Sequence, residues 1–208
     1  MIYSKSLLHS DVQDLYRKVR SSYEKIILSD HELVQLQDVE YSLWKLHYKH
    51  IDEFRKTIKK SSADGESANL VLKRMAGNVQ RNDDKYIVGF KSFLSEATEF
   101  YQNLIVKIRK CYSCSEDSLL YKKSGTSTSF EPKMQKCQFL CHRFLVCLGD
   151  LARYREQYEK PDVQKHNWSV AASHYLEATM IWPDSGNPQN QVFPIILFLI
   201  KSLQSSDL

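Results

Sequence analysis

An all-α domain is the fold class that the sequence predicts, on three observations. Apolar residues recur at spacings of three and four along five stretches, which is the period of an amphipathic helix. Only 5 prolines and 6 glycines occur among 208 residues, and few of them interrupt these stretches. No window alternates apolar and polar residues between turn signals, as a half-buried strand would. At this length, one domain with a substantial core is expected.

The first two predicted helices lie in the N-terminal third of the chain. We expect one helix from Leu7 to Leu28, ended by Ser29 and Asp30, which can cap the next helix. His31 to Lys60 is expected to be mostly helical, with a break near Gln37 as one option. Their apolar stripes are Leu8, Val12, Leu15, Val19, Tyr23 and Ile26, and then Tyr41, Trp44, Tyr48, Ile51, Phe54 and Ile58.

A polar stretch and a third helix follow. Residues 61–82 contain Gly65 and Gly77 and are predicted to form a long loop, with a helical turn within 70–75. Residues 83–112 are predicted to be helical, because their apolar residues fall on one face. That face consists of Tyr86, Phe90, Phe93 or Leu94, Ala97, Tyr101, Leu104 and Ile108.

Two further helices are predicted in the C-terminal half. A loop rich in Ser, Thr and Gly spans residues 113–132 and precedes a helix over 134–159. A fifth helix is expected over 168–182 and is stopped by Pro183. Ala171, Tyr175, Ala178 and Pro183 match the second helix of a tetratricopeptide repeat, and Leu145, Leu148 and Gly149 match the first. The connector exceeds that of a 34-residue repeat by about ten residues, so an ordinary helical hairpin is the alternative.

The helix over 134–159 organises the other candidate residues. Gly149 lies inside it at a cost of about 1 kcal/mol against Ala, which indicates that another helix or a ligand approaches closely. Arg153 follows Asp150 by one turn on a polar face of this helix. Arg155 lies roughly 200° around the helix from Arg153, so the two arginines cannot serve one site. The alternative for Arg153 is a solvated side chain beside a helical Asp.

Charge and motifs restrict the function. The net charge of +4 is too weak to imply nucleic-acid binding unless it is clustered. No stretch is long enough to span a membrane. We therefore expect no membrane partner, and we expect no cofactor. We also expect no enzymatic activity, because the sequence contains no catalytic triad order, HExxH, Walker loop or GxGxxG. The 5 cysteines and the absence of a signal peptide indicate a reducing compartment. A zinc site from Cys111, Cys114, Cys137, Cys141 and His142 is the alternative to small buried thiols.

A basic face on the second predicted helix provides the candidate ligand chemistry. Lys45, Lys49, Lys56 and Lys59 lie near one side, and alone they are typical of a solvated face. Lys49 would supply a point charge, Arg153 a planar guanidinium with several N–H donors, and Tyr154 a hydroxyl. These groups suit a phosphate monoester, which carries a charge of about −1.5 to −2 at neutral pH.

Three segments resemble a known family. They are SLWKLHYKHI at residues 42–51, LGDLARYR at 148–155 and ATMIWPDSGNPQNQ at 178–191. They are similar to the 14-3-3-like, tetratricopeptide-containing N-terminal domain of the SMG-type adaptors of nonsense-mediated mRNA decay, which are related to the ever-shorter-telomeres, telomerase-activating proteins. The sequences of these segments are most similar to plant members of the family. The resemblance covers roughly residues 10 to 191. The resemblance implies antiparallel helical hairpins in a right-handed, 14-3-3-like/TPR-type array.

The resemblance also implies a function and a site. It implies an adaptor that binds phosphoserine or phosphothreonine on a partner, with Lys49 and Arg153 as phosphate ligands, Tyr154 beside them and Lys56 as a weaker third candidate. The implied partners are a phosphorylated up-frameshift-type RNA helicase and a related adaptor as a heterodimer. The expected location is the cytoplasm, with the nucleus as an addition.

The C-terminal tail departs from the resemblance. We expect residues 1–191 to form an incomplete 14-3-3-like/TPR helical domain and 192–208 to form an apolar tail outside the family pattern. A retained intron or a mispredicted gene model would explain the tail, so a truncated adaptor is the expectation. Two other functions stay open: a telomerase-associated subunit that binds RNA or telomeric DNA, which the weak net charge disfavours, and a non-functional product of a truncated transcript.

Overall fold

Helices account for nearly all of the chain that the structure describes, as the sequence predicts. A computed structural model of the chain describes residues 9–29, 32–72, 82–112, 130–159 and 166–183. The helices are α1 (Ser10–Ile27), α2 (Leu33–Leu72), α3 (Asn82–Cys111), α5 (Phe130–Glu159) and α6 (Ser169–Ile181). These ranges include no strand, and none of their helices is long and apolar enough to cross a bilayer.

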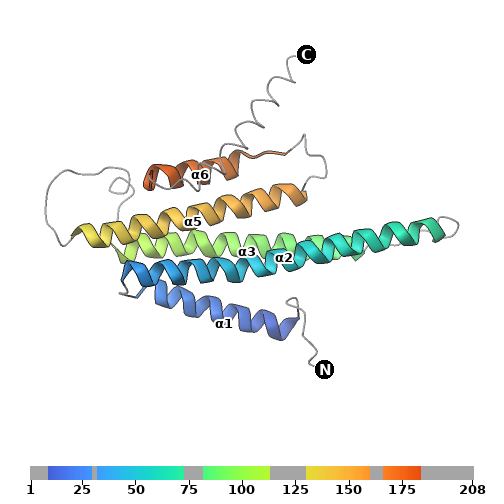
Figure 1. Ribbon diagram of the computed structural model, residues 1–208, viewed down its shortest axis with the longest axis horizontal. Coiled ribbons are helices and arrows are strands. Elements are labelled where there is room, and N and C mark those ends of the chain that lie inside the picture. The colour runs from blue at the N-terminus through green and yellow to red at the C-terminus, as the bar shows by residue number, and fades with distance from the viewer. Residues whose placement is uncertain (1–8, 30–31, 73–81, 113–129, 160–165, 184–208) are drawn as a thin grey trace, which may run out of the picture.

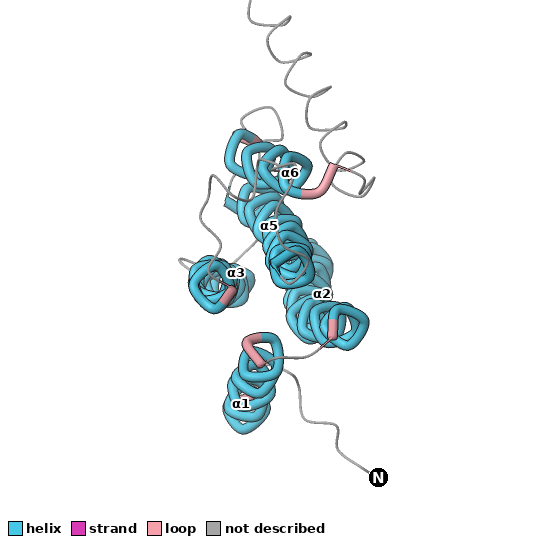
Figure 2. Tube along the Cα trace, turned by 90° about the vertical axis from the view of Figure 1, so that its left-hand side faces the viewer, coloured by secondary structure: helices cyan, strands magenta, loops and turns pink. Residues whose placement is uncertain are grey.

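Successive helices lie side by side and run in opposite directions (Figure 1). Each helix contacts the next: α1 packs on α2, α2 on α3, α3 on α5 and α5 on α6. Viewed along their length, α2 and α3 lie between α1 on one side and α5 with α6 on the other (Figure 2). Helix α2 also contacts α5, and this brings the two elements of the predicted phosphate site together.

The predicted apolar faces of α3 and α5 form the core. Phe90, Leu94, Ala97, Tyr101 and Ile108 of α3 are buried. On α5 the buried residues include Leu140, Phe144, Leu145, Leu148 and Leu151. The ring centroids of Tyr101 and Phe144 are 5.4 Å apart, so the aromatic side chains of α3 pack directly against α5.

The predicted stripes of α1 and α2 are partly wrong. Leu15 is exposed, and its neighbour Tyr16 faces the core instead. On α2, Tyr41 and Tyr48 are 57% and 41% exposed, whereas Leu43 and His47 are buried. The prediction assigned the large aromatic side chains to the buried face. The face of α2 that meets α1 and α3 instead carries leucine and histidine between its aromatic residues.

Two predicted boundaries also differ. Helix α2 passes through Gln37 without a break and continues to Leu72, so the first part of the expected loop over 61–82 is helical. Apart from Gly65, residues 61–72 contain no strong helix breaker, which allows the continuation. Helix α5 begins at Phe130, and Pro132 lies in its first turn, where the missing N–H costs nothing. The remainders of the two predicted loops, 73–81 and 113–129, lie outside the described residues.

Close packing of α6 against α5 explains Gly149. A Cβ atom added at Gly149 would lie 2.4 Å from Cε1 of Tyr175, well inside van der Waals contact. Ala171, Tyr175 and Ala178 are buried on the side of α6 that faces α5. Of the two approaches that the sequence allowed, another helix is therefore the one observed. Both the repeat and the ordinary hairpin require this α5–α6 pair.

Candidate phosphate-binding site

Arg153 belongs to a hydrogen-bonded group that joins α5 to α6. Its Nη2 atom donates to Oδ1 of Asp150 at 3.1 Å, and the Tyr175 hydroxyl donates to the same oxygen at 2.7 Å. Burial lowers the pKa of Arg153, but its hydrogen bond with Tyr175 and the Asp150 carboxylate outweigh this and raise the pKa overall. Arg153 is therefore a fixed, permanently charged group rather than a solvated side chain.

Tyr154 provides the aromatic surface next to this charge. The guanidinium carbon of Arg153 lies 4.7 Å from the centroid of its ring. Tyr154 is only 6% exposed, and burial raises the pKa of its hydroxyl, so the group stays protonated. The ring thus acts as a platform for a cation. Donation from this hydroxyl to a phosphate stays a prediction.

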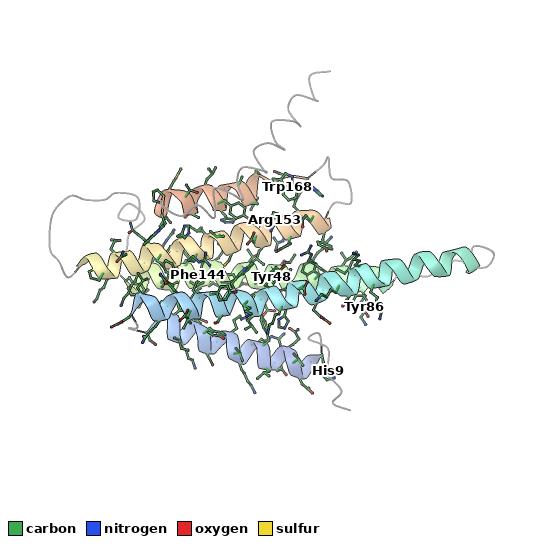
Figure 3. The ribbon with its side chains drawn as sticks, viewed as in Figure 1. His9, Tyr48, Tyr86, Phe144, Arg153 and Trp168 are labelled. Carbon is green, nitrogen blue, oxygen red and sulfur yellow. The ribbon has the colours of Figure 1, made fainter. Side chains whose placement is uncertain are left out.

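Lys49 lies on α2 and is exposed. Neither a hydrogen bond nor an ion pair occupies it within the ranges given above. Its neighbour Tyr48 is labelled beside Arg153 in Figure 3, where α2 passes α5. Tyr48 also contributes to the electrostatic environment that raises the pKa of Tyr154, after burial as the main cause. The structure thus places Lys49 on α2, which contacts the helix that carries Arg153, and the Lys49 amine is unpaired among these residues.

Lys56 is placed differently. Its side chain is 70% exposed, and its Nζ pairs with Oδ2 of Asp52 at 2.6 Å, one turn back on α2. No contact with Arg153 or Tyr154 is found for Lys56 in the described part of α2. A surface pair of this kind contributes little to stability.

Arg55, the residue before Lys56, was missed by the sequence reasoning. Its guanidinium carbon lies 5.5 Å from the centroid of the Tyr154 ring. Burial lowers the pKa of Arg55, but hydrogen bonding to Tyr158 outweighs it, so the net pKa is raised. Arg55 follows Tyr48 by seven residues, which places both on one face of α2, and this spacing was the available signal.

Arg155 points away, as predicted. Its Nη2 atom donates to the Ser95 hydroxyl of α3 at 2.8 Å. Arg153 meets α6 through the oxygen that Asp150 shares with Tyr175. The angular separation on α5 therefore places the two arginines in different environments.

Within the described residues, the cysteines do not form a cluster of metal ligands. Cys137 and Cys141 are buried in α5, whereas Cys111 is exposed and its thiol contacts the Leu28 carbonyl. His142 is buried, and its Nδ1 donates to the Ala178 carbonyl at 3.0 Å. No group of three potential metal ligands occurs in the described ranges, and Cys114 lies outside them.

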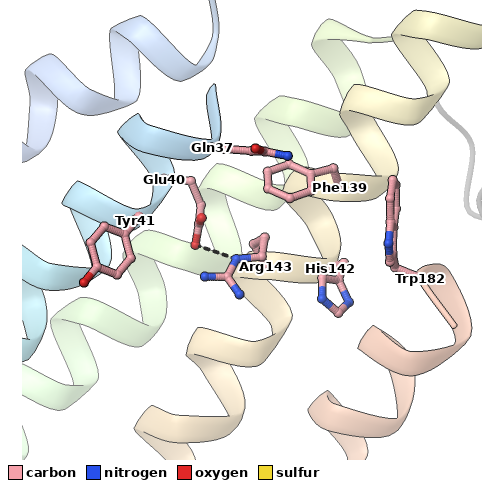
Figure 4. A pocket seen from close by; sticks show the side chains of 7 residues that line it. All are labelled: Gln37, Glu40, Tyr41, Phe139, His142, Arg143 and Trp182. Carbon is pink, nitrogen blue, oxygen red and sulfur yellow. Dashed lines mark hydrogen bonds and ion pairs between the residues drawn. The ribbon is translucent and has the colours of Figure 1, made fainter. Parts of the chain in front are cut away.

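A second polar group lines a pocket nearer the start of α2 (Figure 4). Gln37, Glu40, Tyr41, Phe139, His142, Arg143 and Trp182 surround it. Glu40 is only 2% exposed and accepts a hydrogen bond of 2.9 Å from Nε of Arg143. Burial raises the pKa of Glu40, and the Arg143 guanidinium opposes this rise. Because Glu40 and Arg143 compensate each other, this pocket offers little net charge for a phosphate.

Together, the fold and the site define a helical array with an aromatic, cationic patch between α2 and α5. A family model described as telomerase activating protein Est1 matches residues 38–159. That range covers more than half of the chain and contains Lys49, Arg55 and Arg153. The chain belongs to this family, as the resemblance of its segments implied.

Several curated relatives are similar over most of the chain. The nonsense-mediated mRNA decay factor SMG7-like of Arabidopsis thaliana is 46% identical over 204 residues, which are 98% of this chain and 19% of that protein. The decay factor SMG7 of the same plant is 37% identical, over 86% of this chain and 17% of the relative. Telomerase-binding protein EST1A of Danio rerio is 26% identical, over 88% and 11%. The chain thus spans less than a fifth of the length of these relatives.

Proposed function

We propose that this chain is a phosphoserine- or phosphothreonine-peptide-binding module of an adaptor in nonsense-mediated mRNA decay. Its similarity to two relatives named as decay factors supports the pathway. The geometry of Arg153 supports the ligand class, because a fixed guanidinium suits a phosphate, and an exposed lysine on the neighbouring helix α2 would add a second charge. The partner would be a phosphorylated RNA helicase of the up-frameshift type, and a related adaptor would join it in the cytoplasm.

The main support for this proposal is the hydrogen-bonding state of the Arg153 guanidinium nitrogens. Asp150 uses one terminal nitrogen, while the Nε atom is buried without a hydrogen-bond partner among the described residues. A buried donor without an acceptor is costly, and a phosphate oxygen would satisfy it. Lys49 would approach from α2 as a mobile point charge, and Arg153 would fix the orientation of the ester from α5.

Replacing Arg153 is expected to abolish phosphate-dependent binding. Arg153→Ala should weaken binding of a phosphorylated Ser-Gln peptide about 100-fold, because the charge-assisted hydrogen bonds from the Arg153 guanidinium to the phosphate are lost. Binding of the unphosphorylated peptide should change little. Fluorescence anisotropy with both labelled peptides measures the difference, and thermal unfolding shows whether each variant is folded.

Arg155→Ala is the matched control, since Arg155 has the same chemistry but bonds to Ser95. It should leave phosphopeptide affinity within about twofold of wild type, because a lost surface hydrogen bond far from the ligand has a small effect. Equal losses in the two variants would refute the site. Binding that ignores phosphorylation and weakens steeply with salt would favour the nucleic-acid alternative instead.

A further inference from the structure

Arg55 differs in its partners from four other partly buried arginines. Arg20, Arg109, Arg143 and Arg153 each pair with a carboxylate, from Glu96, Glu177, Glu40 and Asp150 respectively. Arg55 instead contacts the Tyr154 ring and bonds to Tyr158, and it has no carboxylate partner within the described residues. Its positive charge is thus held in place by aromatic groups and is not neutralised.

This uncompensated charge lies next to the proposed phosphate ligand. The guanidinium carbons of Arg55 and Arg153 lie 5.5 Å and 4.7 Å from the centroid of the same ring. A phosphate accepts hydrogen bonds on three oxygens, so one phosphate beside this ring could accept from both guanidinium groups. Both cations contact the Tyr154 ring, which fixes them relative to α5.

Charge balance gives an independent reason for a third cation. Arg153 is paired with Asp150, and Lys56 with Asp52, so each pair is close to neutral. Lys49 would then leave only one net positive charge to meet a phosphate that carries about −2. Arg55 supplies the second.

We propose that Arg55 is a third phosphate-binding residue, acting with Lys49 and Arg153 and taking the place that the sequence assigned to Lys56. This inference rests on the proposed function of the same site. It assigns the specificity for a doubly charged phosphate over a carboxylate to the guanidinium of Arg55.

The test compares Arg55→Gln with Lys56→Gln in the full chain. Fluorescence anisotropy is measured for three labelled peptides that carry phosphoserine, serine or aspartate at one position. Arg55→Gln should weaken phosphoserine-peptide binding about tenfold and leave the other two peptides within about twofold, since only the dianion uses the extra charge. Lys56→Gln should change all three by less than about twofold. Tyr158→Phe, which keeps every charge and removes only the bond that orients Arg55, should produce a smaller, phosphate-specific loss.

The outcomes separate the inference from the function on which it rests. If the wild-type chain binds phosphoserine selectively and Arg55→Gln does not reduce that selectivity, Arg55 is not a ligand and only this inference fails. Equal or larger losses for Lys56→Gln would likewise return the role to Lys56. If Arg55→Gln does not fold, Arg55→Met, which removes the charge but keeps an unbranched side chain, serves in its place. Unchanged selectivity in a folded Arg55→Met overturns the inference. A wild-type chain that binds all three peptides equally overturns the proposed function itself.

Discussion

Gly149→Ala is expected to lower the free energy of unfolding by about 2 kcal/mol, although alanine is normally the better helix former. The added methyl group would lie 2.4 Å from Cε1 of Tyr175, so the ring and α6 must move. Overpacking of a core contact costs about 1–3 kcal/mol, and the displaced Tyr175 hydroxyl would also lose its bond to Asp150. The gain in helix propensity of about 1 kcal/mol offsets only part of this. Urea unfolding followed by far-ultraviolet circular dichroism measures the difference.

Gly89→Ala is the matched control in α3. A Cβ atom there would lie 3.5 Å from Cε1 of Phe54, which is an ordinary van der Waals contact. This variant should be stabilised by up to about 1 kcal/mol, since only helix propensity changes. The two glycine variants are therefore expected to shift stability in opposite directions. A Gly149→Ala protein as stable as Gly89→Ala would contradict the close approach of α6.

Acidification from pH 7 to pH 5 is expected to destabilise the fold, mainly through His47. Its Nδ1 atom lies 2.9 Å from the Leu43 carbonyl and 3.1 Å from the Tyr101 hydroxyl, and its Nε2 atom is buried without a hydrogen-bond partner among the described residues. Burial lowers the pKa of His47 from 6.5 to about 3, with the nearby charges of Arg20 and His50 acting in the same direction and the Leu43 carbonyl opposing them. The folded state therefore holds a neutral ring.

The direction of this pH effect on stability follows from how many protons the folded and the unfolded chain bind. Below pH 6.5 the unfolded chain protonates this histidine while the folded chain does not, so the stability present above pH 6.5 is lost as the pH falls toward 3. His47 alone should remove about 2 kcal/mol at pH 5. His50, whose pKa is also lowered by burial, adds to the loss. Glu40 acts in the opposite direction, because burial raises its pKa and its folded form takes up a proton more readily.

His47→Gln is the variant that isolates this effect. Its unfolding free energy should change between pH 7 and pH 5 by about 2 kcal/mol less than that of the wild type, whatever its stability at pH 7. Identical pH profiles for His47→Gln and wild type would remove His47 as the cause.

The fold was largely predictable because its signal is local. Phe90, Leu94, Tyr101 and Ile108 repeat along α3 with the helical period, and all four are buried. The errors arose where the period fits two adjacent faces. Tyr16 and Leu15 are equally compatible with a stripe on α1, and only contact with α2 and α3 selected Tyr16, whose ring lies 4.4 Å from that of His50 and 5.9 Å from that of Phe93.

The candidate site could be proposed from the sequence where it depends on one helix or on sequence motifs shared with a family. The separation of Arg153 from Arg155 follows from helix geometry alone, and the resemblance named Lys49. The contact of Arg55 with Tyr154 was not accessible in this way, because Arg55 and Lys56 are neighbours on α2. They differ only in what the adjacent helix places beside them.

The sequence by itself thus determined the helical class, the buried faces of α3 and α5, and the helix that carries Arg153. The tertiary structure decided which residues meet across helices: Tyr175 against Gly149, Asp150 between Tyr175 and Arg153, and Arg55 over Tyr154. The physical reason is that helix periodicity fixes direction around one axis only. The rotation and separation of neighbouring helices depend on how their side chains pack, which no single stretch of sequence specifies.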